Sequence, residues 1–172
     1  MRRLNVFFDV DNTLILWNGK LRNHTREVFE RLTEAGHTIY IWSGVGIRRW
    51  DMKRHELDGF VKDYFIKPLD RHHERLESLG VPMTPDFVVD DHSAVVDAFG
   101  GFHVSDMPGP DDSELLDVLW AIEEHARRDD GATPVEAPAP ESTAPACPDC
   151  GRPLDAVQGF RVCRSCGYTE QA

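Results

Sequence analysis

Short apolar runs that alternate with helical patterns are the feature that most constrains the fold of this chain. Five runs are typical of buried strands: residues 4–8, 38–42, 64–66, 87–89 and 102–104. Helical patterns lie among them at residues 25–35, 47–57, 69–79 and 113–125. Strands that alternate with helices build a parallel sheet covered on both faces. The sequence therefore predicts an α/β fold.

A hairpin is expected directly after the first strand. Residues 14–17 and 20–22 flank the dipeptide Asn18-Gly19. Asn-Gly between two such runs favours a type I′ turn, so residues 14–22 should form a small flap.

Composition divides the chain into three parts. All four cysteines lie in residues 147–166, whereas all eight histidines lie at or before His125. Between these groups, residues 129–146 contain four prolines, five alanines and no aromatic residue, and such a segment cannot bury enough apolar surface to fold. We predict an α/β domain at 1–128, a flexible linker at 129–146 and a small cysteine domain at 147–172.

Charge and hydropathy narrow the functional class. The 172 residues carry a net charge of -11, which opposes general binding to phosphate backbones. No stretch approaches the roughly 20 apolar residues of a membrane span, and the first apolar run is interrupted by Asp9 and Asp11, too early for a signal peptide. We expect a soluble, cytoplasmic protein.

Polar residues follow each of the first four strands. In a parallel sheet, ligands bind beyond the carboxyl ends of the strands, so these residues should meet at one edge. Clustered carboxylates need a cation among them, and hard oxygen ligands suit Mg²⁺. A hydroxyl and an ammonium are then left to hold a phosphate. The four groups are Asp9 to Thr13, Ser43-Gly44, Lys67-Pro68 and Asp90-Asp91.

This set of side chains suits phosphoryl transfer through a carboxylate. One carboxylate can attack phosphorus to form an aspartyl-phosphate, which water then hydrolyses. A second carboxyl group two residues along can protonate the leaving oxygen and later activate that water.

The four groups resemble, in order, the motifs of the haloacid dehalogenase-like (HAD) phosphatase superfamily. The residues that carry the resemblance are VFFDVDNTL, IYIWSG, Lys67 before Pro68, and FVVDD, and the resemblance covers about residues 4–125. It implies a Rossmann-like core, with Asp9 as nucleophile and Asp11 as general acid/base. Ser43 with Gly44 and Lys67 would hold the phosphoryl group. The Mg²⁺ site would comprise Asp9, Asp11, Asp90 and Asp91, with Asp91 a direct ligand and Asp90 its neighbour.

A calcium loop, a P-loop and a phosphate-receiving signalling domain fit these residues less well. A calcium loop would need glycine where Leu14 stands, and no P-loop motif occurs. Phosphate-receiving signalling domains carry their acidic pair on the first strand, whereas this chain has it on the fourth. Singly, Ser43 could cap a strand end, Lys67 could be a solvated lysine, and the acidic pair could cap a helix.

The resemblance also bears on access to the site. Members of this superfamily carry cap domains between the first and second or the second and third motifs, and neither gap leaves room for one here. The site should be open, with residues 14–22 as its only flap. Residues 48–55 form a dense basic and aromatic cluster, which is either a solvated helix face or a guide for an anionic substrate.

The cysteines form two knuckles that resemble a zinc ribbon. Cys147 and Cys150 form one pair, Cys163 and Cys166 the other, each is followed by glycine, and 12 residues separate the pairs. Four thiolates satisfy a structural Zn²⁺ completely. Two disulfides or a redox pair remain as alternatives. The ribbon could bind nucleic acid, bind a protein or associate with a second copy of itself, and the sequence does not distinguish these alternatives.

The sequence thus favours an uncapped, Mg²⁺-dependent phosphatase with a zinc ribbon on a flexible linker. Its substrate would be a phosphorylated molecule of unknown class. Two alternatives stay open: processing of phosphorylated nucleic-acid ends, with the ribbon as the docking module, and a non-catalytic adaptor that recognises phosphate.

Overall fold

The computed structural model describes residues 1–128, 155–157, 160–162 and 169–171. The chain divides into two compact units, Met1–Ala132 and Thr133–Ala172. The predicted linker at 129–146 and the four cysteines lie outside the described residues.

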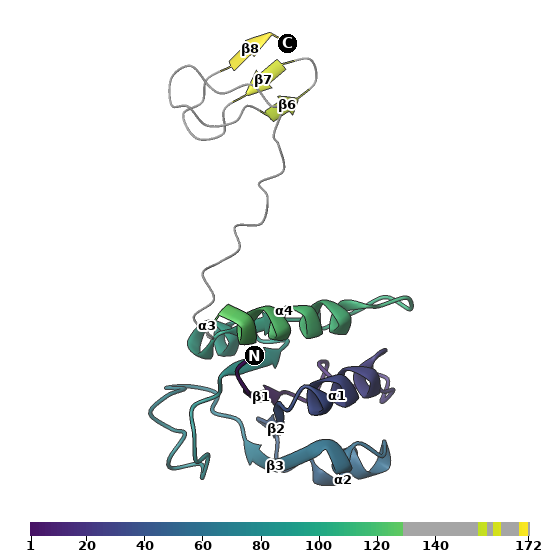
Figure 1. Ribbon diagram of the computed structural model, residues 1–172, viewed down its shortest axis with the longest axis vertical. Helices are drawn as coiled ribbons and strands as arrows, with labels where there is room; N and C mark the ends of the chain where they lie inside the picture. Colours follow the sequence, from purple (N-terminus) through teal and green to yellow (C-terminus); the bar gives the residue numbers. More distant parts are fainter. Residues whose placement is uncertain (129–154, 158–159, 163–168, 172) are drawn as a thin grey trace. The chain divides into compact units, whose positions relative to one another are not determined.

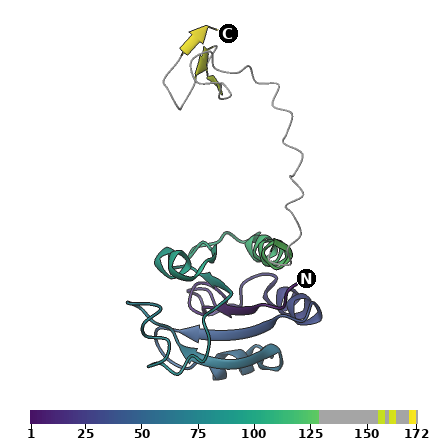
Figure 2. The same cartoon turned by 60° about the vertical axis from the view of Figure 1, so that its left-hand side comes forward.

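A five-stranded parallel sheet forms the centre of the first unit. Its order is β3-β2-β1-β4-β5, so the chain runs outward from β1 to β3 and then returns to the other side of β1. Adjacent strands lie side by side in Figure 2, and in the central register Phe7 faces Tyr40 on β2 and Val88 on β4. This sheet confirms the predicted α/β class. The strands are β1 (Asn5–Phe8), β2 (Thr38–Ser43), β3 (Val61–Ile66), β4 (Phe87–Asp90) and β5 (Gly101–His103).

Helices cover both faces of the sheet (Figure 1). Alternate residues of a strand point to opposite faces, so Val6 and Phe8 belong to one buried cluster and Phe7 to another. The first cluster receives apolar residues from α1, α2 and α4, and the second receives Val95 of α3 together with residues 76–83. The helices are α1 (Thr25–Glu34), α2 (Arg49–Arg54), α3 (Ser93–Phe99) and α4 (Glu114–Arg128), with a short 3-10 helix, η1 (Asp58–Phe60).

The helix predicted at residues 69–79 was wrong. This segment is a series of turns, and its hydrogen bonds mix the α-helical spacing, as from Arg75 N–H to the Arg71 carbonyl, with three-residue spacings, as from Leu76 to His73. Arg71 has a φ of 42°, in the left-handed region, which interrupts a helix. Of residues 69–79, Leu76 alone is buried, so packing supplies little to hold a continuous helix.

The turn type predicted for the flap was also wrong. A type I′ turn needs positive φ at both central residues, and here Gly19 has a φ of 77° whereas Asn18 has no positive φ. The flap closes around a three-residue loop instead, with the Leu16 N–H donating to the Lys20 carbonyl at 2.9 Å. One antiparallel bridge, between Ile15 and Leu21, joins its two sides.

The second unit contains a three-stranded antiparallel sheet in the order β6-β7-β8. Its strands are β6 (Asp155–Val157), β7 (Phe160–Val162) and β8 (Thr169–Gln171). Throughout the described part of the chain, every helix is too short or too polar to cross a lipid bilayer.

Candidate active site

The predicted site residues of the α/β domain meet at the carboxyl ends of the strands. They follow β1, β2, β3 and β4, and the order of the sheet reverses beside β1, where such folds bind ligands. The chain leaves β1 through a sharp turn at Asn12, whose φ is 60°. Asparagine adopts this left-handed conformation more readily than most residues, so the local sequence favours the turn.

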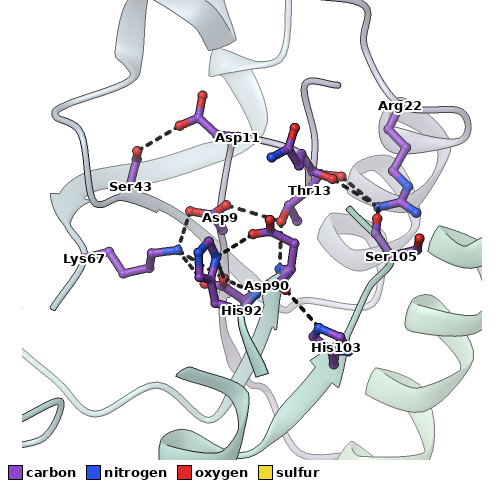
Figure 3. Close-up of polar contacts among 12 residues, drawn as sticks. Asp9, Asp11, Thr13, Arg22, Ser43, Lys67, Asp90, His92, His103 and Ser105 are labelled. Atoms are coloured by element: carbon purple, nitrogen blue, oxygen red, sulfur yellow. Dashed lines mark hydrogen bonds and ion pairs between the residues drawn. The ribbon is translucent and has the colours of Figure 1, made fainter. Parts of the chain in front are cut away.

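Lys67 bridges two carboxylates in the centre of the site (Figure 3). Its ammonium donates to Asp9 Oδ1 at 2.8 Å and to both oxygens of Asp90 at 3.0 Å. All three residues are buried, at 4%, 2% and 0% exposure for Lys67, Asp9 and Asp90. A buried charge is tolerated only when it is paired, so this contact holds three strand ends together.

The electrostatics of this group are unbalanced. Burial and the charge of Asp90 raise the pKa of Asp9 to about 7, although Lys67 opposes the shift. Burial also raises the pKa of Asp90, against the effects of Lys67 and the His92 backbone N–H. Burial by itself would lower the pKa of Lys67, but the two carboxylates outweigh it and raise that pKa. One ammonium therefore does not fully compensate the carboxylates, and a cation placed among them would lower their free energy.

Asp11 lies beside the end of β2. Its Oδ2 accepts hydrogen bonds from Ser43 Oγ at 3.2 Å and from Arg48 Nη1 at 2.5 Å. Figure 3 shows that Asp11 and Ser43 approach each other away from the pair formed by Lys67 and Asp90. The Asp11 side chain is 49% exposed, whereas Asp9 is enclosed, so the two carboxyl groups differ in environment.

Thr13 connects the loop after β1 to the end of β4. Its hydroxyl donates to Asp9 Oδ2 at 3.2 Å and accepts the backbone N–H of Asp91 at 3.1 Å. The backbone carbonyl of Asp91 faces His103 Nε2 at 2.8 Å. These contacts orient Asp9 and the acidic pair relative to each other.

Three neighbouring residues have the composition of a metal site. Ligand atoms of Asp90, Asp91 and His92 lie within 4.8 Å of one another. His92 Nδ1 lies 2.9 Å from Asp91 Oδ1. With Asp9 nearby, carboxylate oxygens dominate this donor set, and such oxygens suit Mg²⁺.

Gly44 leaves room for the segment after Lys67. A Cβ atom at position 44 would lie 2.7 Å from a side-chain methyl group of Leu69. A larger residue would therefore require the Leu69 side chain to turn aside. The side chain of Leu69 is itself 65% exposed at this edge.

Short segments connect the first three strands of the sheet. Between β1 and β2 lie the flap and α1, and between β2 and β3 lie α2 and η1. Within residues 1–128, the flap and α2 border the site, and the open site stays a prediction.

The predicted strand-end residues lie together in the structure: Asp9, Asp11, Ser43, Gly44, Lys67, Asp90 and Asp91. The four predicted zinc ligands lie outside the described residues: Cys147, Cys150, Cys163 and Cys166. Sequence reasoning did not find the contact of Arg48 with Asp11, the position of His92 or the buried Arg22. The signal for Arg48 was its place in the basic cluster directly after the second motif. A buried arginine has no comparable signal, because its partners are remote in sequence.

One family model matches the part of the first unit that carries the first two motifs. Residues 6–66 match the family model of the haloacid dehalogenase-like hydrolases. No curated protein matches the chain.

Two solved structures resemble the fold. An uncharacterized protein from Listeria monocytogenes serotype 4b is 13% identical, with a TM-score of 0.49, over 72% of this chain and 99% of that one. The core domain of a "putative phosphoglycolate phosphatase" from Streptococcus pneumoniae TIGR4 is 17% identical, with a TM-score of 0.45, over 72% and 97%. At these identities the similarities carry no information about substrate.

Proposed function

We propose that this chain is a Mg²⁺-dependent phosphatase of the haloacid dehalogenase-like kind, which hydrolyses phosphate monoesters through an aspartyl-phosphate on Asp9. The observation that carries the proposal is the contact of Lys67 with both Asp9 and Asp90, next to Asp11 and Ser43. The family match over residues 6–66 supports it independently.

The two aspartates of the first motif suit different roles. In the first step a carboxylate oxygen of Asp9 attacks phosphorus, the bond from phosphorus to the leaving oxygen breaks, and Asp11 gives that oxygen a proton. In the second step Asp11 takes a proton from water, which attacks phosphorus and releases phosphate from Asp9. The enclosed position of Asp9 and the half-exposed position of Asp11 agree with this division.

Ser43 and Lys67 would hold the oxygens of the transferring group. The Ser43 hydroxyl and the Lys67 ammonium come from the ends of β2 and β3, which lie on the same side of β1, and each already contacts one aspartate of the first motif. Donors held in place before reaction stabilise developing charge without reorganisation.

The carboxylates fit a divalent cation. Asp9, Asp90 and Asp91 would hold Mg²⁺ through oxygen. Burial and the charge of Asp90 raise the pKa of Asp9, and a cation would stabilise the charged form of this carboxylate. When bound, the ion would neutralise charge on the phosphoryl group.

The test is phosphate release from a panel of small esters, nucleotides, phosphopeptides and phosphorylated oligonucleotides, with Mg²⁺ and with a chelator. We expect Asp9→Asn to lower kcat by at least about 10³-fold, because the variant has no nucleophile. Asp117→Asn, an exposed carboxylate on α4, is the matched control and should keep wild-type turnover. Equal turnover by Asp9→Asn and wild type would refute the mechanism, and no turnover of any ester by folded, Mg²⁺-bound protein would favour a phosphate-recognising adaptor.

For the second unit we propose a zinc ribbon at residues 147–172. Its three-stranded antiparallel sheet supports this, since one cysteine pair precedes β6 in the chain and the other, Cys163 and Cys166, lies between β7 and β8. Elemental analysis should find about one Zn²⁺ per chain, and Cys163→Ser should reduce that content, because four thiolates complete the site. Zinc-free wild-type protein with two disulfides would contradict the proposal.

A further inference from the structure

A pocket of about 290 Å³ opens between the flap and α2 on the Asp11 side of the site. Its lining includes Asp11, Trp17, Arg48, Arg54 and His55, but neither Asp9 nor Lys67. We propose that this pocket binds the leaving group of the substrate, and that it selects small aryl phosphates whose ring carries a second anionic group. The inference rests on the proposed phosphatase function and names its substrate class.

The position of Asp11 makes this the leaving-group side. A general acid must lie within hydrogen-bonding distance of the oxygen that it protonates. The phosphoryl group would contact Asp9, Lys67 and Ser43, so the alcohol beyond it extends past Asp11. Since Asp11 is part of the pocket lining, the leaving group enters this pocket.

One cation at the pocket is available to bind an anion. The lining contains two arginines, Arg48 and Arg54, and two carboxylates, Asp11 and Asp51. Arg48 is occupied, because its Nε donates to Asp51 at 2.7 Å while its Nη1 contacts Asp11. Within residues 1–128, no carboxylate pairs with Arg54, which is exposed at the pocket. Its guanidinium is therefore available for an anionic substituent.

Trp17 provides the aromatic part of the site. It stands on the flap, lines the pocket and is 76% exposed. Stacking of a flat ring on a large exposed indole is favourable, and for nucleic-acid bases it stabilises binding by about 1–3 kcal/mol. Trp50 is equally exposed, at 78%, but does not line the pocket. The two tryptophans thus form a matched pair for experiment.

The volume of the pocket suits a small leaving group. Pockets for drug-sized ligands usually measure about 300–1,000 Å³, so this one is at the lower limit. One ring with its substituents fits such a volume, and a small aryl ester is therefore the class that we expect.

The experiment compares kcat/KM for phenyl phosphate, 4-carboxyphenyl phosphate and glycerol phosphate at low ionic strength. We expect wild-type protein to prefer the carboxylated aryl ester over phenyl phosphate by about tenfold, the scale of one charge pair in a partly desolvated site. Arg54→Gln should bring this ratio to within about twofold of unity, because its anion partner is gone. Lys53→Gln removes the same charge from the adjacent, exposed position outside the pocket and should keep the preference.

The aromatic part is tested with the paired tryptophans. Trp17→Ala should lower kcat/KM for both aryl esters by about tenfold and leave glycerol phosphate within about twofold of wild type. Trp50→Ala should leave all three values unchanged.

The outcomes separate this inference from the proposed function. Asp9-dependent hydrolysis without a preference for the carboxylated ester, or an equal loss in Arg54→Gln and Lys53→Gln, would overturn the leaving-group site alone. Asp9-dependent hydrolysis of glycerol phosphate without hydrolysis of either aryl ester would do the same. If no ester of any kind is hydrolysed, the proposed function fails and the inference fails with it.

Discussion

Lys67 shows how one residue determines the character of the site. Its buried ammonium contacts Asp9 and Asp90, two carboxylates that would otherwise be buried without a counter-charge. Pro68 follows it and favours an extended backbone at Lys67, so the side chain leaves the end of β3 towards β1 and β4. Most lysines are solvated, whereas Lys67 is buried and provides the positive charge between two carboxylates.

His37 carries a residue-scale prediction about pH. Its Nδ1 accepts the Leu4 N–H at 3.1 Å, and the residue is 5% exposed. Burial lowers the pKa of His37, although the carboxylate of Glu123 on α4 opposes the shift. The unfolded chain therefore binds a proton at a higher pH than the folded chain. The stability that neutral His37 contributes is fully present above the ordinary histidine pKa of 6.5, and it is lost as pH falls from that value through the lower pKa of the folded chain.

We expect the Tm of wild-type protein to fall between about pH 7.5 and about pH 5.5 by more than that of His37→Gln, because glutamine does not titrate in this range. Thermal unfolding followed by circular dichroism at both pH values measures the difference. Parallel decreases in the two proteins would show that His37 contributes nothing to the pH dependence.

At the scale of elements, the close approach of β5 to β4 depends on Gly101. A Cβ atom at this position would lie 1.9 Å from the Val88 carbonyl oxygen, and the φ of Gly101 is 150°. We expect Gly101→Ala to lower the free energy of unfolding by more than about 2 kcal/mol, because backbone atoms cannot move aside without breaking the strand pair. Urea denaturation measures the loss.

Gly59→Ala is the control for this substitution. No atom lies within 4 Å of a Cβ atom at position 59, and the φ of Gly59 is not in the left-handed region. Its effect should stay within about 1 kcal/mol. Similar losses in the two variants would mean that the contact with Val88 is not the cause.

Arg22 connects the flap to the segment between β5 and α4. Its side chain is fully buried, pairs with Asp112 at 2.8 Å and Glu114 at 2.7 Å, and donates to the Ser105 carbonyl at 3.1 Å. Arg22→Met should lower the free energy of unfolding by about 3 kcal/mol, because it leaves carboxylates without their buried partner. Arg31→Met, which removes the exposed pair with Glu123, should cost less than about 1 kcal/mol. Chemical denaturation compares them, and equal losses would argue against a special role for Arg22.

For the whole molecule, we predict that the first unit folds and acts without the second. Both hydrophobic clusters and the entire candidate site lie within residues 1–128, so Met1–Ala132 contains every contact described for them. A chain that ends at Ala132 should keep its Tm within a few degrees and its kcat/KM on small esters within about twofold of the full-length values. Calorimetry and phosphate release test this, and loss of folding would show that the second unit stabilises the first.

The sequence by itself was sufficient for the fold class and for the meeting of the predicted strand-end residues at one edge of the sheet. Apolar runs such as 38–42 are buried strands because alternate residues fill the clusters on the two faces of the sheet. Asp9, Ser43, Lys67 and Asp90 could be expected to meet because the carboxyl ends of parallel strands share one edge. These inferences depend on local residue patterns and on the order of the strands and helices, and both can be inferred from the sequence.

Only the tertiary structure decided which side chains pair within that edge and how deeply they are buried. Lys67 and Asp90 are 23 positions apart in the sequence, and Arg48 and Asp11 are 37 positions apart. The partners of the buried Arg22 follow it by 83 to 92 positions. The failure of the helix at residues 69–79 has the same origin, because helical spacing without a buried face does not hold a helix. Pairing and burial depend on distances in space and on exclusion of water, which no local pattern records.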